Sequence, residues 1–198
     1  MQGQSKPDLP NWLLRQSQLD VIHAKVIWLD EMRNAPALSL EKLNLQVVSP
    51  PWKSFIKNHR VTLSAIVSAG TNEPITINAN VYGNDINRLS EWYGSLETKL
   101  KNANVVAFKP WFDYSTITHP INLQSGVGST DTTIEFAKNQ VQSVTSNVAL
   151  DTVKLLLKAN TAPLILNKLV GELDWKNSAT EQSFNVSHLT LNTSNGLT

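Results

Sequence analysis

Histidine offers the widest choice of chemistry in this chain, because its ring can bind a metal or carry a proton near neutral pH. The four histidines lie far apart in the sequence: His23, His59, His119 and His188. Zinc sites commonly take two of their ligands from positions only a few residues apart. No two histidines here are spaced in that way, so we expect no metal site, and a structural or solvent-facing position for each histidine.

Other nucleophiles and cofactor motifs are equally scarce. The chain has no Cys, which excludes disulfides, thiolate nucleophiles and Cys-ligated zinc. It also has no Gly-x-Ser-x-Gly motif, the sharp turn that presents the catalytic serine of many hydrolases. Gly126 and Gly128 resemble part of a dinucleotide-binding motif, but the third glycine and the following helix are missing. The pair instead predicts a bend or bulge in a strand, and we expect neither enzyme activity nor a cofactor.

The charge of the chain is nearly balanced, with 17 Lys and Arg against 16 Asp and Glu and a formal net charge of +1. No electrostatic excess is available to hold a phosphate backbone, so we expect no nucleic acid partner. The polar residues are mainly amides and hydroxyls, with 20 Asn, 18 Ser and 16 Thr among 198 residues. A chain of this length can bury roughly 70% of its unfolded surface, which permits a real core.

The elements that must position any site follow from the hydrophobic period, which is two and therefore typical of strands. Apolar residues alternate with polar ones over residues 59–69 and again over 74–82. Residues 70–73 between them predict a hairpin loop. Similar segments recur at residues 19–29, 38–48, 93–106, 121–129, 132–136, 141–150, 164–175 and 182–192. The sequence thus predicts an all-β fold of long, twisted, mainly antiparallel strands.

Three local features interrupt these strands. The apolar phase slips across Glu41 and Lys42, which predicts a β-bulge, because a slip of one residue would otherwise turn the following side chains to the wrong face. Short helices are expected at residues 9–16 and, behind the capping residue Asp85, at residues 86–93. Helix is otherwise absent from the pattern, so the apolar face of the sheet needs another cover.

That cover has three possible forms. The sheet can pack on a second sheet as a sandwich, close on itself as a barrel, or curl into a trough whose apolar floor is covered by an apolar ligand. A structural or binding β-sandwich or solenoid module is the alternative to the trough. The two differ in whether a large apolar surface stays open.

An ordered series of short segments resembles one family. They are residues 11–16 (NWLLRQ), 24–40 (AKVIWLDEMRNAPALSL), 58–60 (NHR), 92–96 (WYGSL), 126–128 (GVG), 148–153 (VALDTV) and 169–175 (LVGELDW). Together they are similar to the N-terminal part of YhdP-type proteins, members of the AsmA-like superfamily that includes TamB. Phe136 departs from the pattern, since the family often has Trp at that place.

The resemblance implies a segment of a longer Gram-negative envelope protein that is anchored in the inner membrane and extends through the periplasm. Such proteins form a continuous, curled β-sheet with an apolar groove, and the implied partner is phospholipid moving between the inner and outer membranes in support of the outer-membrane permeability barrier. On this basis we expect residues 1–10 to be an added start or a linker, and residues 11–198 to be a single β-groove segment.

The groove that the resemblance implies needs an apolar floor and no catalytic residue. A lipid chain exposed to water loses about 0.8 kcal/mol per CH₂, on the order of 12 kcal/mol for roughly fifteen methylenes, and an apolar floor recovers much of that cost. The expected lipid-binding residues are Val61, Leu63, Ala65, Val67, Ile75, Ile77, Ala79, Val81, Leu96, Leu100, Val144, Val148 and Leu150.

Two further expectations concern architecture. Trp28, Asp30 and Arg33 are predicted to organise the turn that follows residues 19–29, through a carboxylate and a guanidinium. The strands at residues 19–29 and 182–192 are predicted to expose unpaired edges, which makes self-association through edge strands possible.

Overall fold

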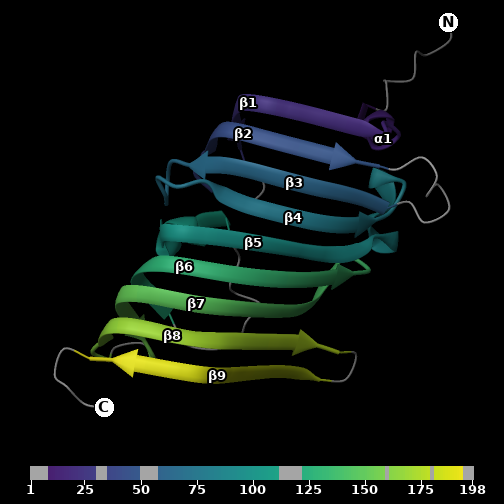
Figure 1. The fold of residues 1–198 in the computed structure, drawn as a ribbon. Coiled ribbons are helices and arrows are strands. Elements are labelled where there is room, and N and C mark those ends of the chain that lie inside the picture. The colour runs from purple at the N-terminus through teal and green to yellow at the C-terminus, as the bar shows by residue number, and fades with distance from the viewer. Residues whose placement is uncertain are drawn as a thin grey trace, which may run out of the picture.

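The computed structural model describes residues 9–29, 35–49, 58–111, 122–158, 161–178 and 181–193. Within them nine strands form one antiparallel sheet in which each strand pairs with the next along the chain (Figure 1). The strands are β1 (Gln18–Trp28), β2 (Leu38–Val48), β3 (Asn58–Val67), β4 (Ile75–Tyr82), β5 (Tyr93–Asn104), β6 (Asn122–Ala137), β7 (Gln140–Leu156), β8 (Leu164–Asn177) and β9 (Gln182–Asn192).

The sheet is open and curled. β1 and β9 form its two edges, and among the described residues no other strand pairs with the outer side of either. In Figure 1 the strands turn away from the viewer at their left-hand ends. The expected all-β fold, with long antiparallel strands in one curled sheet, is confirmed.

One strand differs from the expectation. The sequence predicts separate strands at residues 121–129 and 132–136, whereas the structure has the single strand β6. Between Val127 and Ile134 the residues are glycine, serine, threonine and aspartate, so both faces are polar or small. The backbone nevertheless pairs with β5 and β7 through this stretch. Hydrophobic alternation cannot reveal a strand without an apolar face.

The predicted bend at Gly126 and Gly128 is confirmed, since the register between β6 and β7 shifts on both sides of Ser125. A Cβ atom at Gly128 would lie 2.0 Å from the carbonyl oxygen of Ala149 on β7. Only glycine allows the two backbones to approach so closely.

Bulges recur across the sheet and account for its curl. Five strand residues other than glycine have a positive φ: His23, Lys42, Asn102, Thr152 and His188, one each on β1, β2, β5, β7 and β9. The register of the neighbouring pairs shifts at these places. The bulge predicted at Glu41 and Lys42 is among them. Because a bulge bends its strand and increases the twist, a series of bulges curls the whole sheet.

The helical segments are short and lie at the ends of strands. α1 (Leu9–Leu14) precedes β1, η2 (Ile86–Glu91) links β4 to β5, and η3 (Val105–Trp111) follows β5. The predicted cap at Asp85 is confirmed, since its carboxylate accepts a hydrogen bond from the Asn87 N–H at 2.9 Å. η2 is a 3₁₀ helix interrupted at Arg88, whose φ and ψ are not helical.

Among the described residues, the core is split into two clusters rather than spread evenly. Phe108 of η3 packs against Val67 and Ala103, which are only 1% and 0% exposed. Val148, Leu150, Val153 and Leu166 form the second cluster, on β7 and β8. Full burial of an aliphatic side chain contributes about 1.5–3 kcal/mol, so these clusters hold the sheet in its curled form.

Candidate functional site

The candidate site is the apolar face of the sheet, because the register places one apolar residue from every strand side by side. Residues that are directly opposite in antiparallel strands point to the same face. One such row crosses the whole sheet and contains only apolar residues, and we call it the apolar row: Leu19, Val47, Val61, Ala79, Leu96, Ile134, Val144, Trp175 and Phe184.

The apolar row is long compared with a lipid chain. Neighbouring strands lie about 4.8 Å apart, so the eight steps from β1 to β9 span roughly 38 Å. The hydrocarbon core of a bilayer is about 30 Å thick, so one acyl chain spans about 15 Å. The row could therefore line two acyl chains end to end.

The next row on the same face is apolar except at its centre. It consists of Val21, Leu45, Leu63, Ile77, Thr98, Thr132, Ser146, Leu173 and Val186. Six of its nine members are aliphatic, and the three hydroxyl residues are neighbours on β5, β6 and β7. Neither row contains a charged side chain.

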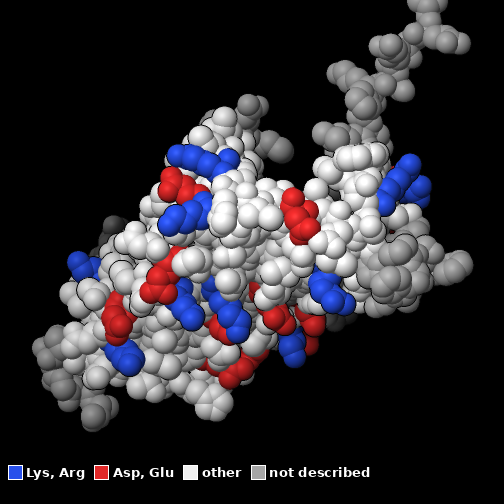
Figure 2. Space-filling view, turned by 45° about the horizontal axis from the view of Figure 1, so that its top comes forward, with Lys and Arg blue, Asp and Glu red and all other residues white. Residues whose placement is uncertain are grey.

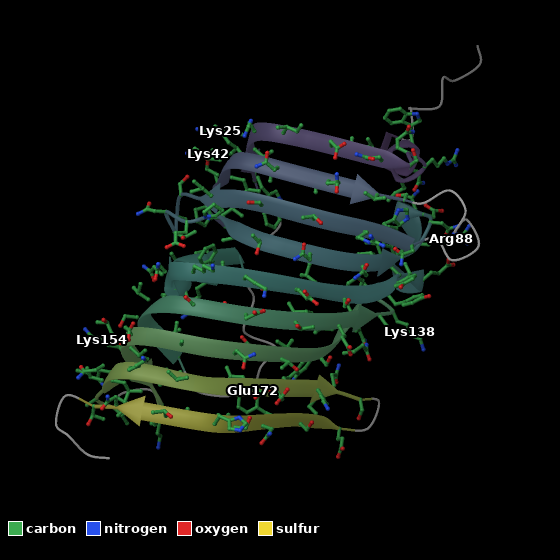
Figure 3. The ribbon with its side chains drawn as sticks, viewed as in Figure 1. Lys25, Lys42, Arg88, Lys138, Lys154 and Glu172 are labelled. Atoms are coloured by element: carbon green, nitrogen blue, oxygen red, sulfur yellow. The ribbon has the colours of Figure 1, made fainter. Side chains whose placement is uncertain are left out.

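The opposite face is polar. Glu172 lies on β8, next to the edge strand β9, on the side that faces the viewer in Figure 3. Ion pairs join neighbouring strands there, such as Lys99 to Asp131 at 3.0 Å, and this carboxylate raises the pKa of Lys99. Figure 2 shows acidic and basic residues interspersed, with no large area of one sign. Such a face suits contact with water.

A hollow of about 600 Å³ crosses this polar face over β5 to β9. Its lining includes Lys99, Asp131, Ala149 and Glu172, and His188 approaches Glu172 to 3.4 Å at its β9 side. Two of its lining pairs are in ion-pair distance, Lys99 with Asp131 and His188 with Glu172. The hollow therefore lies on the side of the sheet away from the apolar rows and has no part in the candidate site.

All thirteen predicted floor residues lie on these strands, and the structure divides them by burial. Ala65, Val67, Ala79, Val148 and Leu150 are buried, and Ile75 and Leu100 pack against the cluster around Phe108. The other six are half-buried, so their side chains remain partly open to solvent: Val61, Leu63, Ile77, Val81, Leu96 and Val144. The structure thus brings the predicted residues together on one face. The six half-buried residues form its accessible floor.

The sequence reasoning missed the part of the apolar face at the β9 edge. Phe184 is 45% exposed, and Val186, Leu189 and Leu191 are exposed as well. Phe184 and Leu191 lie opposite Trp175 and Leu169 of β8. The alternation within residues 182–192 could have identified these residues, had the pattern been extended to the last strand.

One end of the strands near the floor is closed by a histidine. His59 is 6% exposed, and its ring stacks on that of Trp92 with centroids 6.0 Å apart. Its Nε2 donates to the carbonyl oxygen of Gly83 at 2.9 Å, so Nδ1 accepts from the Ser49 hydroxyl at 2.6 Å in the neutral ring. Both nitrogens are satisfied within the protein, as expected for a structural histidine.

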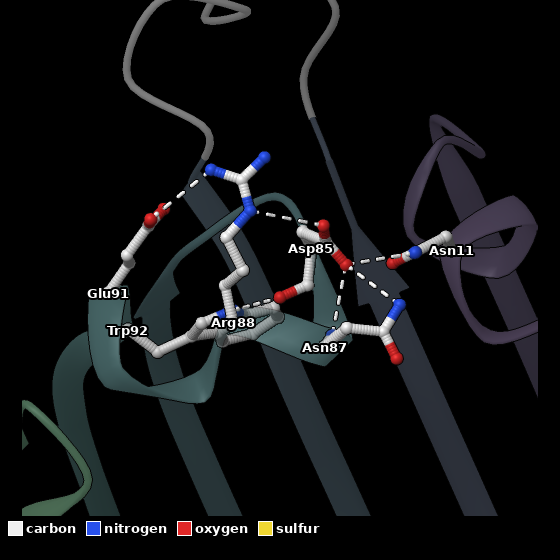
Figure 4. A network of polar contacts seen from close by, with 6 residues as sticks. All are labelled: Asn11, Asp85, Asn87, Arg88, Glu91 and Trp92. Atoms are coloured by element: carbon white, nitrogen blue, oxygen red, sulfur yellow. Dashed lines mark hydrogen bonds and ion pairs between the residues drawn. The ribbon is translucent and has the colours of Figure 1, made fainter.

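A polar network beside His59 joins α1 to η2 (Figure 4). The Asp85 carboxylate accepts from the Asn11 side chain at 3.0 Å and lies 3.4 Å from Arg88. The Trp92 indole N–H donates to the Asp85 carbonyl oxygen at 2.9 Å. The backbone N–H of Asn87 and the amide of Asn11 hold the pKa of the Asp85 carboxyl below its ordinary value of 3.8. The network is a structural junction, and it fixes Trp92 over Gly83.

Of the three residues predicted to organise a turn, the structure places one. Trp28 ends β1 with 48% of its surface exposed. Asp30 and Arg33 lie outside the described residues, so their role in that turn stays a prediction. His119 also lies outside them, whereas His23 and His188 are exposed at bulges.

The described residues hold no other constellation with evident chemistry. Among them, no three His, Asp or Glu side chains lie close enough together to hold a metal ion. Within the same residues, no helix has the length and apolar character needed to span a membrane.

A family model described as YhdP protein matches residues 1–198. The comparison with curated proteins and the comparison with solved structures each gave no match.

Proposed function

Because the chain belongs to the YhdP family over its whole length, we propose that it is a segment of a periplasmic lipid-transport protein whose curled sheet shields phospholipid acyl chains from water. The full-length protein would be anchored in the inner membrane and would carry phospholipid between the inner and outer membranes. It would thereby support the permeability barrier of the outer membrane. Phospholipid is the proposed partner, and no catalytic residue is needed.

The observation that carries this proposal is the apolar row, which is unbroken from β1 to β9 and includes exposed Phe184. Monomeric proteins rarely leave a large contiguous apolar surface in water, so such a surface indicates a ligand or a partner. An acyl chain gains about 0.8 kcal/mol for each CH₂ that it buries, without any specific contact. A floor of this kind would therefore accept chains of different length.

The margins of the sheet suit the charged end of a phospholipid. In Figure 3, Lys42 and Lys154 lie at one margin, and Lys138 lies at the other. Lysine and arginine at an interface attract phosphate groups. Acyl chains on the floor would leave the headgroups at the open side, within reach of water and of these cations.

The proposal is tested by purifying the chain from a Gram-negative host and analysing it by native electrophoresis, followed by mass spectrometry of the organic extract. Phospholipid that migrates with the protein and is displaced by added lipid is the expected result. Protein that carries no lipid and takes up none from vesicles of phosphatidylethanolamine and phosphatidylglycerol would favour the alternative, a structural or binding β-sandwich or solenoid module of the cell envelope without lipid transport.

A further inference from the structure

A cluster of hydroxyl groups interrupts the apolar floor at its centre. Thr98, Thr132 and Ser146 are directly opposite one another on β5, β6 and β7. Ile77 precedes them in the row and Leu173 follows them. Directly opposite residues in a sheet have Cβ atoms about 4.5–5.5 Å apart, so the three side chains form one continuous polar site, which we call the hydroxyl site.

The hydroxyl site has hydrogen-bonding capacity that the described residues do not use. The hydroxyls of Thr132 and Ser146 bond to each other at 2.7 Å, and Ser146 is 9% exposed. A hydroxyl pair of this kind uses one of its two hydrogens, which leaves the other as a donor. The half-buried Thr98 makes no side-chain hydrogen bond within the described part of the chain.

On one side these groups border the apolar row, and on the other side Thr130 of β6 lies between Leu100 and Val148 on the same face. Leu96, Ile134 and Val144 occupy the apolar row on the same three strands. A polar group in apolar surroundings is unfavourable unless it finds a hydrogen-bond partner. A ligand that combines an apolar chain with neutral acceptor oxygens would satisfy both rows at once.

We propose that the hydroxyl site binds the ester carbonyl oxygens of a glycerolipid whose acyl chain lies along the apolar row. The proposal rests on the proposed function and adds a place at which the lipid is held. An acyl chain of about 15 Å covers about three strand spacings. A lipid held at β5 to β7 can therefore extend its chains toward β2 on one side or β9 on the other.

The lack of positive charge in the two rows favours binding of an ester carbonyl rather than of a phosphate group. The two rows contain no Lys or Arg, and a phosphate is bound more strongly by such residues than by hydroxyls. Ester carbonyls are neutral acceptors that occur in all diacyl phospholipids. The hydroxyl site would accordingly position lipids with different headgroups in the same way.

The test compares two lipids that differ only in their linkage, dioleoyl phosphatidylcholine with ester bonds and its dialkyl analogue with ether bonds. We expect the chain to bind the ester lipid about threefold to tenfold more tightly, the effect of one or two net hydrogen bonds. The variant T98V/T132V/S146A should lose this preference and retain its affinity for the ether lipid. Thr133→Val, on the opposite face of β6, is the matched control and should change neither.

The outcomes separate this inference from the function on which it rests. Equal affinity of the unmodified chain for both lipids, or a preference that survives in the triple variant, would overturn the hydroxyl site while leaving lipid binding intact. Failure to bind either lipid would overturn the proposed function. If the triple variant does not fold, the single variant Thr98→Val decides, because the Thr98 hydroxyl has no hydrogen-bond partner among the described residues. A partial loss of the preference is then expected.

Discussion

A carboxylate placed at Ile77 should abolish lipid binding without unfolding the protein. Ile77 lies on the floor between Leu63 of β3 and Thr98 of β5, and its side chain is half-buried. The change Ile77→Asp removes apolar contact and puts a charge where an acyl chain would lie. Because this part of the floor is open, water can reach the carboxylate as long as no lipid is bound.

The expected magnitudes differ for folding and for binding. Full burial of an isoleucine is worth about 1.5–3 kcal/mol, so a half-buried one contributes about 1 kcal/mol. With partial desolvation of the carboxylate, we expect a total loss of about 1–2 kcal/mol, a fall in Tm of roughly 2–8 °C for a chain of this length. Aspartate in a hydrocarbon environment costs about 2.5–3.5 kcal/mol, which corresponds to a lipid affinity weakened roughly 100-fold.

Two further variants make the prediction specific. Val67→Asp places the same charge under Phe108, where burial is complete, and should unfold the chain because the cost is several kcal/mol. Asn80→Asp is the matched control on the polar face, where Arg60 lies directly opposite. Asn78→Asp would not be a suitable control, because the new carboxylate would lie opposite that of Glu97 on β5.

Thermal melts and titration with a fluorescent phospholipid check both halves of this prediction. Ile77→Asp should melt as a folded protein and fail to bind the lipid, whereas Asn80→Asp should behave like the unmodified chain. If Ile77→Asp binds lipid normally, or if it unfolds as completely as Val67→Asp, then Ile77 belongs to an ordinary closed core. The interpretation of this face as an open groove would then be wrong.

Three other predictions follow from the structure. Phe108→Ala should lower the free energy of unfolding by about 3–5 kcal/mol in urea titrations, because Phe108 packs on Val67 and Ala103. A loss below about 1 kcal/mol would mean that η3 does not cover the core. The lowered pKa of Asp85 means that its bonds to Asn11 and Asn87 are complete above pH 3.8 and are lost as the pH falls through the pKa of the folded state. NMR signals of the Asn87 amide and Trp92 indole should report this loss as the pH is lowered below 3.8, and Asp85→Asn should remove the change. The open edges of β1 and β9 should make the sedimentation coefficient rise with protein concentration, and a strictly monomeric chain would argue that both edges are covered.

Much of the fold could be predicted because each strand except β6 has one apolar face, and alternation reveals such a strand directly. The bulge at Lys42 was visible as a slip in that alternation. The bulges at Asn102 and Thr152 were not predicted. They lie where the register changes between partners, and a register depends on two strands rather than on one local pattern.

The candidate site could be predicted as a set of residues but not as an arrangement. Alternation identifies Ile77 and Leu96 as apolar positions, yet their rows exist only once all nine strands are in register. For the same reason, the sequence could not show that Phe108 covers Val67 whereas Ile77 remains partly exposed to solvent. The hydroxyl site was hidden because Thr98, Thr132 and Ser146 come from three strands and look like ordinary polar residues in each.

Photo-crosslinking at adjacent positions of β5 and of β6 tests the central claim most directly, namely that lipid lies on one face of this sheet. A photoreactive residue at Leu96 or Ile134 faces the groove, and one at Glu97 or Glu135 faces the opposite side. With radiolabelled phospholipid in the host cell, we predict crosslinks from positions 96 and 134 and none from positions 97 and 135. Equal labelling from both faces, or labelling from neither, would contradict the account.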